Sequence, residues 1–298
     1  MKFVTYKVSN NQDFGVYEQK LNKIFSLNAL IGSNFKNLLE FIDSSLENKI
    51  GLINEVLKNR NLVEGLGIDF SDVTLCSPIP MPRGDVLCLG LNYKDHLEET
   101  SRVLGTSSEL PKYPIYFSKR ATFTTGPFED IPSHSNITTK LDYENELAII
   151  IGKKGKDISQ DKVEDYIFGY TILNDFSARD LQKNNGQWFR GKSLDYLTAL
   201  GPWIVSKDEI PFPVHLDIIT RVNNEIRQTS NTKEFIFDIP TVVSDLSKGM
   251  TLMPGDIIAT GTPSGVGMGL NPRVWLKDGD KVECEIKGIG TLTNTIKD

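Results

Sequence analysis

The sequence predicts an α+β protein in which a small α+β N-terminal domain precedes a larger, mainly β catalytic domain. Helical spacing of apolar residues dominates the chain before residue 78, and short apolar runs separated by Gly and Pro turns dominate it after residue 84. Between these parts, Pro78, Pro80 and Pro82 exclude a helix or a central strand. We therefore place a boundary there, giving domains 1–78 and 79–298; the alternative is a stiff loop inside one domain.

The composition is that of an ordinary soluble globular protein, with 298 residues of which 39% are hydrophobic and 24% charged. A net charge of -6 favours neither nucleic acid nor an anionic membrane as a partner. Three cysteines without metal-ligand spacing are typical of reduced thiols. The first residues lack the apolar core of a signal peptide, and no apolar run approaches the ~18 residues that span a membrane. We expect a cytoplasmic protein.

The N-terminal domain is predicted to contain one strand and two helices. Residues 1–8 alternate weakly, as a strand does. Ser33 can cap a first helix whose apolar residues follow at i, i+3, i+4 and i+7, namely Phe35, Leu38, Leu39 and Ile42. A second helix carries one apolar face, formed by Leu46, Ile50, Ile53 and Leu57.

The larger domain is predicted to be built from short strands. The strand candidates are residues 86–91, 114–118, 147–151, 167–174, 203–205, 216–222, 257–260 and 281–286. Short helices are expected around 160–165 and 239–248. Strands and helices do not alternate around a Gly-rich phosphate loop, so the pattern disfavours a Rossmann or P-loop nucleotide site.

Glu144 and Glu146 are the most informative pair of residues. They lead into the apolar run 147–151, which indicates a strand entering the core. Residues two apart on a strand point to the same face, so the two carboxylates converge and repel unless a positive group lies between them. A hard divalent cation would relieve the repulsion. The alternative is a solvated edge strand that needs no metal.

Three further residues cluster where the strand 167–174 ends. Asp175, Arg179 and Gln182 are four and three positions apart, and the helix predicted to begin at 177 would place them on one face. An acid, a cation and an amide together suit a metal beside an anionic ligand. The structural alternative is a salt bridge made by Arg179.

His96 and Glu99 are spaced about one helical turn apart, so Glu99 can orient the imidazole. Such a pair is a candidate general base for activating water, although a single histidine is more often a structural residue. Lys192 lies in a predicted loop, where a lysine usually faces solvent. Thr262 lies in the Gly-rich turn 261–267, which can approach a ligand closely or serve only as a tight turn.

The order of these motifs resembles the fumarylacetoacetate hydrolase family over residues 86 to 267. The motifs are Gly90-Leu91-Asn92-Tyr93 with His96 and Glu99, Tyr143-Glu144-x-Glu146-Leu147, Asn174-Asp175 with Arg179 and Gln182, Gly191-Lys192-Ser193, Pro254-Gly255-Asp256 and 261–267. The resemblance implies a mixed β-sandwich roll, a homodimer and an N-terminal extension domain.

The resemblance also implies a role for each site residue. Glu144, Glu146 and Asp175 would bind Mg2+ or Mn2+, with Ca2+ a further option. His96 and Glu99 would lie on a lid segment, with Lys192 beside the metal and the substrate. Substrate contacts would come from Arg179, Gln182, Thr262 and Lys119, the last followed here by Arg120 where the family commonly has proline or a small residue.

The activity that this resemblance implies is hydrolase or lyase cleavage of a C–C bond in a small anionic 2-oxoacid, through an enolate. Acylpyruvate hydrolysis and oxaloacetate decarboxylation are the first choices, and isomerisation or tautomerisation of a 2-hydroxymuconate-type or oxaloacetate-type diacid is the alternative. A non-catalytic metal-binding scaffold is a third possibility. The loop 100–114, with Trp188 and Phe189, is expected to set the substrate tail.

Overall fold

The computed structural model describes residues 1–45, 48–59, 63, 65–184 and 186–298. Its central sheet has eleven strands. Ten of them follow the order β4 (Ile68–Asp69), β3 (Lys23–Ser26), β2 (Asn11–Glu18), β1 (Lys2–Val8), β13 (Thr198–Ser206), β11 (Ile167–Asp175), β10 (Asn145–Ile151), β16 (Ile257–Ala259), β6 (Val86–Gly90) and β7 (Ile115–Lys119). The eleventh strand, β5 (Thr74–Cys76), pairs with β1.

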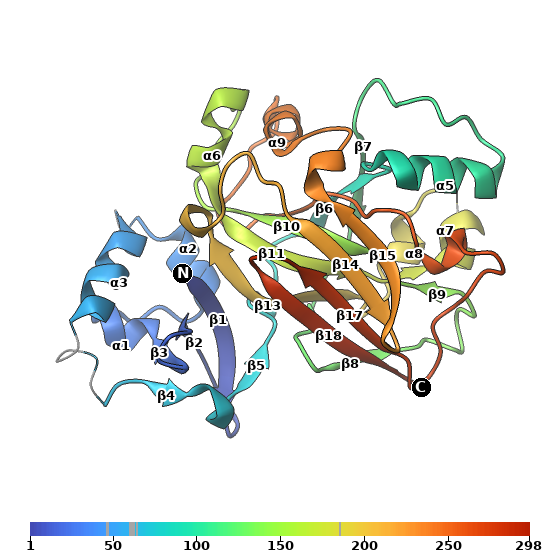
Figure 1. Ribbon diagram of the computed structural model, residues 1–298. Helices are drawn as coiled ribbons and strands as arrows, with labels where there is room; N and C mark the ends of the chain where they lie inside the picture. The colour runs from blue at the N-terminus through green and yellow to red at the C-terminus, as the bar shows by residue number, and fades with distance from the viewer. Residues whose placement is uncertain (46–47, 60–62, 64, 185) are drawn as a thin grey trace.

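A second sheet packs against the central one and lies in front of it in Figure 1. Its order is β15 (Glu225–Asn231), β14 (Asp217–Val222), β17 (Lys281–Ile286), β18 (Gly290–Lys297) and β8 (Asp130–Pro132). Two short strands, β9 (Leu141–Asp142) and β12 (Ser177–Ala178), pair separately. Both large sheets contain one parallel pair among antiparallel ones, which confirms the mixed, mainly β α+β fold.

Strand β10 packs against other layers of the structure on both of its faces. Alternate residues of a strand face opposite sides. Leu147 and Ile149 belong to the apolar cluster shared with the second sheet, whereas Ala148 and Ile150 belong to the cluster shared with the N-terminal helices. Because both faces are covered, every residue of β10 is buried and the strand reads as a continuous apolar run.

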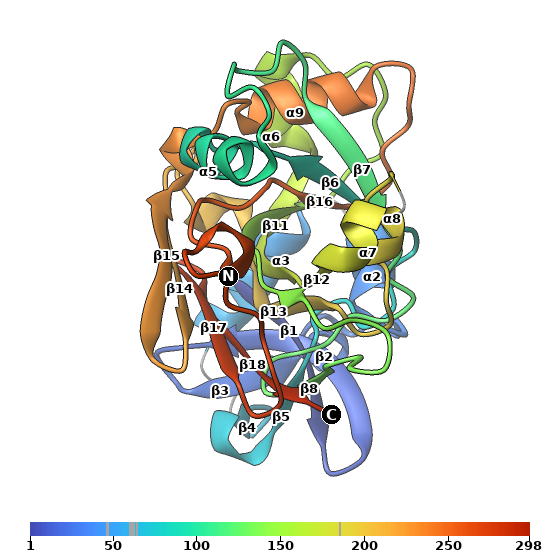
Figure 2. The ribbon, with the colours of Figure 1, turned by 90° about the vertical axis from the view of Figure 1, so that its right-hand side faces the viewer.

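Most helices lie at the two ends of the molecule. The N-terminal helices are α1 (Leu27–Ile31), α2 (Leu38–Asp43) and α3 (Lys49–Lys58). At the opposite end lie α5 (Lys94–Leu104), α7 (Arg179–Asn184) and α8 (Phe189–Lys192), on the side that Figure 2 faces. The others are α6 (Val163–Tyr166), α9 (Ile239–Ser247) and the 3-10 turns η1 (Phe70–Asp72), η2 (Gln160–Lys162), η3 (Lys207–Glu209), η4 (Thr232–Glu234) and η5 (Gly267–Gly269).

The N-terminal segment contacts the rest of the chain through strand pairing and through packing of aromatic side chains. Strand β1 pairs antiparallel with β13, with Phe3 opposite Ile204. The Phe3 ring lies 4.8 Å from the Phe168 ring and 5.8 Å from the Phe41 ring, measured between centroids. Strand pairing and aromatic contacts therefore cross the boundary proposed at residue 78. A separate N-terminal domain at 1–78 stays a prediction.

Most predicted elements exist, with shifted ends. Ser33 is not the cap of the first helix: α2 begins at Leu38, and its cap is Asn37, which accepts a hydrogen bond from Glu40 N. The Ser33 hydroxyl instead donates to Asn28 Oδ1. The second helix is α3, and Leu46 lies outside the described residues. Among the helices that the structure describes, none has the length and apolarity needed to cross a membrane.

Three local predictions near the site were wrong. Residues 177–178 form β12, and the helix starts only at Arg179. Lys192 ends α8 instead of lying in a loop. The first part of the predicted loop 100–114 continues α5 as far as Leu104, where Gly105 takes the left-handed conformation that ends the helix.

Candidate metal centre and its cavity

Three carboxylates meet where strands β10 and β11 begin and end. The strands are antiparallel, with Asn145 opposite Asn174, and Asp175 N donates to Glu144 O at 2.9 Å. This pairing places Asp175 beside the Glu144–Glu146 segment. Carboxylate oxygens of Glu144, Glu146 and Asp175 lie within 4.8 Å of one another, and all three side chains are buried.

Glu146 shows that these residues fit a cation. Its Oε2 accepts a hydrogen bond from Gly261 N at 2.6 Å, while its buried Oε1 has no hydrogen-bond partner among the described residues. Burial, together with the charges of Asp175 and Glu144, raises the pKa of Glu146 well above its usual range. An unpaired buried carboxylate oxygen is costly, and oxygen ligands suit Mg2+, Mn2+ or Ca2+.

Two buried lysines offset part of this negative charge. Lys192 Nζ lies 2.8 Å from Glu144 Oε2 and 2.8 Å from Asp175 Oδ2. Burial alone would lower the pKa of Lys192, but Asp175 and Glu144 outweigh it and raise the value to about 12. Lys119 Nζ lies 2.6 Å from Asp175 Oδ1 and donates to Phe176 O at 2.9 Å. Burial lowers the pKa of Lys119, against the opposing influence of Asp175.

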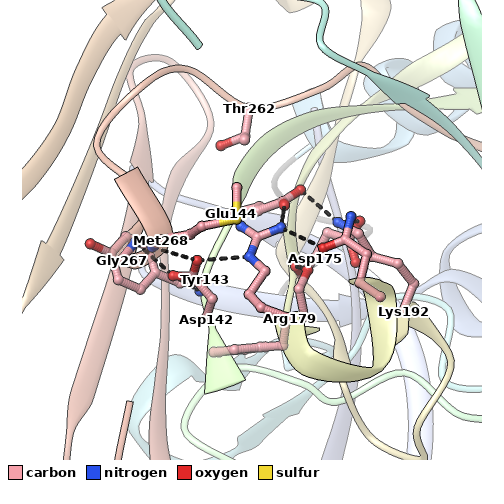
Figure 3. A network of polar contacts seen from close by, with 12 residues as sticks. Asp142, Tyr143, Glu144, Asp175, Arg179, Lys192, Thr262, Gly267 and Met268 are labelled. Atoms are coloured by element: carbon pink, nitrogen blue, oxygen red, sulfur yellow. Dashed lines mark hydrogen bonds and ion pairs between the residues drawn. The ribbon is translucent and has the colours of Figure 1, made fainter. Parts of the chain in front are cut away.

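Arg179 lies between two carboxylates (Figure 3). Its Nη1 donates to Glu144 Oε1 at 2.6 Å and to Gln182 Oε1 at 3.1 Å, and its Nε donates to Asp142 Oδ2 at 2.8 Å. The predicted helical face of Arg179 and Gln182 is thus present, and Arg179 does make salt bridges. Burial raises the pKa of Glu144, but Lys192 and Arg179 hold it below the usual range.

His96 and Glu99 lie on α5 and contact each other. The distance from His96 Nδ1 to Glu99 Oε2 is 3.1 Å, and both side chains are buried. Glu99 Oε1 accepts a hydrogen bond from Gly265 N at 2.9 Å. Since His96 lines the same cavity as Glu144, the helix brings the predicted base to the carboxylates.

A cavity of about 470 Å3 adjoins these residues. Its lining is Leu89, Gly90, Leu91, His96, Thr100, Val103, Phe117, Lys140, Glu144, Arg179, Asp180, Gln182, Lys183, Asn184, Trp188, Lys192, Thr262, Met268, Arg273 and Trp275. Thr100 and Trp188, expected to face the substrate tail, are part of it, whereas Phe189 is not. Lys119 lies behind Asp175 and is not part of the lining, so its substrate contact stays a prediction.

Thr262 lines the cavity, but its hydroxyl is already used. The hydroxyl donates to Asn145 O at 2.9 Å and accepts from Gln228 Nε2 at 2.8 Å. A hydroxyl has one hydrogen to donate. Donation to a substrate carboxylate, as the family resemblance implies, would therefore require Thr262 to release Asn145 O.

Sequence reasoning missed Asp142 and the cations at the cavity. Asp142 precedes Glu144 by two positions, so the strand alternation that grouped Glu144 with Glu146 was a signal that also applied to it. Lys140, Lys183 and Arg273 line the cavity and are exposed. These three residues are far apart in the sequence and come together only in the fold. No local sequence pattern therefore distinguishes them from other surface cations.

Comparisons with known proteins agree with this geometry. A family model described as "Fumarylacetoacetate (FAA) hydrolase C-terminal" matches residues 85–297. Oxaloacetate tautomerase YisK of Bacillus subtilis (strain 168) is 41% identical over 305 residues, covering 99% of this chain and 100% of that protein.

Solved structures are similar over the whole chain. Fumarylacetoacetate hydrolase from psychrophilic Exiguobacterium antarcticum is 36% identical with a TM-score of 0.81, covering 100% of this chain and 99% of that one. Maleylpyruvate hydrolase from Sphingobium sp. SYK-6, in complex with manganese (II) ion and pyruvate, is 26% identical with a TM-score of 0.76 and the same coverage.

Proposed function

Because the chain belongs to the fumarylacetoacetate hydrolase family, we propose that it is a divalent-metal-dependent enzyme that forms the enolate of a small anionic 2-oxoacid. The observation that carries this proposal is the convergence of three buried carboxylates around the unpaired Glu146 Oε1. Glu144, Glu146 and Asp175 would hold Mg2+ or Mn2+, with Ca2+ a further option. A bound cation supplies Lewis-acid stabilisation of the developing enolate charge.

His96 is the proposed base. Its Nδ1 faces Glu99 Oε2, so Nε2 is the ring nitrogen available to take a proton from the substrate or from a water. Glu99 holds the imidazole in this tautomer and is itself held by Gly265 N. Glu99 therefore fixes the direction in which His96 acts.

Arg179 and Lys192 are the proposed ligand-binding cations. Arg179 Nη2 is buried without a hydrogen-bond partner among the residues described, so it can donate to a substrate carboxylate. Two of the three N–H groups of the Lys192 ammonium go to Glu144 and Asp175, which leaves one for an enolate oxygen. Gln182 lines the cavity beside Arg179 and is proposed to contact the ligand; Thr262, whose hydroxyl is already bonded within the fold, is proposed to contact it only as part of the cavity wall.

Keto–enol tautomerisation of oxaloacetate is our first choice for the reaction. The support is the full-length similarity to a protein named oxaloacetate tautomerase, which includes the N-terminal segment. In this reaction His96 Nε2 would take a proton from C3, and the protonated His96 would return it to the enolate oxygen to give the enol and restore the base.

C–C bond cleavage, the reaction favoured from the sequence, is the second candidate. The orientation of His96 by Glu99 suits activation of a water for acylpyruvate hydrolysis, and a similar structure is named maleylpyruvate hydrolase. Decarboxylation of oxaloacetate yields the same enolate without an attacking water. All three reactions pass through a 2-oxoacid enolate, that of oxaloacetate itself in tautomerisation and that of pyruvate in the two cleavage reactions, so the reaction must be found by assay.

The test is Mn2+-dependent turnover measured on oxaloacetate, acetylpyruvate, fumarylpyruvate and a 2-hydroxymuconate. Enol formation from oxaloacetate faster than CO2 release supports the tautomerase, and pyruvate release from acylpyruvates supports the hydrolase. No turnover on any of the four, with tight oxalate binding, would refute the enzyme and support a metal-binding scaffold. Light scattering after size-exclusion chromatography tests the predicted homodimer.

A further inference from the structure

Asp142 is a buried carboxylate that accepts hydrogen bonds from four N–H donors. Its Oδ1 accepts from Tyr143 N at 3.0 Å and from Gly267 N at 2.7 Å. Its Oδ2 accepts from Arg179 Nε at 2.8 Å and from Met268 N at 3.0 Å. Asp142 therefore ties an arginine of the site to two backbone amides of a distant loop (Figure 3).

The hydrogen bond from Arg179 Nε to Asp142 fixes the plane of the guanidinium group. With Nε held by Asp142, the rigid fork directs Nη1 to Glu144 Oε1 and leaves Nη2 buried beside the cavity. Rotation of the fork would break the contact to Glu144, a proposed metal ligand. Asp142 thus determines where Arg179 points.

The second tie holds a loop that also holds the lid helix. In the segment 264–269, the Ser264 hydroxyl donates to Asp95 Oδ2 at 2.7 Å and Gly265 N donates to Glu99 Oε1 at 2.9 Å. A Cβ on Gly269 would lie 2.0 Å from Glu99 Cδ, so the Glu99 carboxylate packs directly against this glycine. The loop is therefore bound to α5 at several residues.

One continuous set of contacts follows from these ties. It runs from α5 through Gly265 to Gly267, from Gly267 to Asp142, and from Asp142 through Arg179 to Glu144. A Cβ on Gly267 would lie 2.8 Å from Asp142 Oδ1 and 2.0 Å from Val274 O, so the close approach of loop and carboxylate needs glycine.

We propose that Asp142 is a positioning residue that couples closure of the α5 lid to the orientation of Arg179 over the carboxylate site. Closure of α5 holds the 264–269 loop in the position from which Gly267 and Met268 donate to Asp142. The filled Asp142 carboxylate then holds Arg179 ready for the ligand. This inference deepens the proposed function and rests on it for the identity of the ligand, a 2-oxoacid or its planar mimic oxalate.

Asp142→Asn tests the coupling with little change of shape. Both oxygens accept from N–H groups, so either orientation of the amide places an NH2 against donors. At saturating Mn2+, the oxalate dissociation constant should rise by about 10- to 100-fold, as for other residues that orient a site. Oxalate should slow hydrogen exchange of the α5 amides in the unsubstituted protein, and the Asp142→Asn protein should lack this response.

Asp280→Asn is the matched control. Asp280 is also buried and accepts from Lys277 N at 2.9 Å and Asn223 Nδ2 at 2.8 Å, but it does not line the cavity. It should lower the melting temperature while leaving oxalate affinity and the oxalate response of α5 unchanged. An Asp142→Asn protein that behaves like this control would overturn the proposal, because its role would then be structural alone.

Ser264→Ala provides a second route that does not disturb a buried charge. It removes the hydrogen bond between the 264–269 loop and Asp95 of α5. It should therefore weaken oxalate binding in the otherwise unsubstituted protein and have a smaller effect when combined with Asp142→Asn. Equal effects in both backgrounds would overturn the coupling. If Asp142→Asn does not fold, Ser264→Ala must alter exchange at the amides of Gly267 and Met268; unchanged exchange there refutes the proposal.

These binding and exchange measurements need no turnover. If the protein converts none of the four oxoacids but shows the coupled response to oxalate, the proposed function fails and the coupling stands. If turnover is found and the response of α5 is independent of Asp142, the coupling fails and the proposed function stands.

Discussion

The carboxylate site and helix α5 are built in opposite ways. Glu146 and Asp175 lie near the ends of β10 and β11, two strands whose residues are all buried, and Glu144 immediately precedes β10. His96 and Glu99 stand on α5, which reaches the site through side-chain and backbone contacts to one loop. Like charges held a few ångströms apart need a rigid support. A base can instead be carried by a separate element that leaves room for the substrate to enter.

The largest effect should come from the rigid part. Glu146→Ala removes the carboxylate whose Oε1 has no hydrogen-bond partner among the described residues, so the protein should bind no divalent metal and turnover should fall by about a thousandfold or more. Elemental analysis after dialysis checks the metal content. Full occupancy in this variant would contradict the assigned ligand. Glu285→Ala, which removes a partly exposed strand carboxylate paired with Arg221, is the control and should keep its metal.

Removing the proposed base from α5 should lower turnover less and leave the metal in place. His96→Ala should lower turnover by about 10^2- to 10^4-fold, the usual contribution of a general base, and should abolish acylpyruvate hydrolysis if that is the reaction. Stopped assays and metal analysis on the same sample check both statements. His215→Ala alters an exposed histidine outside the cavity and should be without effect. Undiminished turnover of the His96 variant would remove it from the mechanism.

Displacing α5 without removing any functional group should have an intermediate effect. A methyl group at residue 269 would overlap Glu99, so Gly269→Ala should push α5 away from the 264–269 loop and lower kcat/KM by about 10- to 100-fold, with Mn2+ affinity retained. Steady-state kinetics and calorimetric Mn2+ titration measure the two quantities. Gly84→Ala is the control, because an added Cβ there meets no atom within 4 Å. Equal kinetics for the two variants would show that the packing of α5 against Gly269 is not needed for activity.

The smallest effect on activity should come from Thr262→Val, in the wall of the rigid part. The hydroxyl is used by Asn145 O and Gln228, so its loss should lower the free energy of unfolding by about 1 kcal/mol. We expect kcat/KM to change by less than about threefold, which urea unfolding and kinetics together will check. A tenfold rise in KM at unchanged stability would instead assign the hydroxyl to the substrate carboxylate.

Predictions from the sequence were most accurate where the responsible contacts are local. The face shared by Glu144 and Glu146 follows from strand alternation, and the contact of His96 with Glu99 follows from helical spacing. Element ends were less accurate: Asn37 displaced Ser33 as a cap because the Asn28 side chain binds Ser33 instead. Several short strands, among them β3, β8 and β12, carried too few residues to show a period.

The sequence by itself determined which chemical groups are present and which near neighbours share a face, since backbone periodicity acts over a few residues. Only the tertiary structure decided that Glu99 meets Gly265, 166 positions away, and that Asp142 meets Gly267, 125 positions away. It also placed Lys119 behind Asp175 and used the Thr262 hydroxyl within the fold. Such contacts arise from the packing of whole layers, which no local spacing encodes.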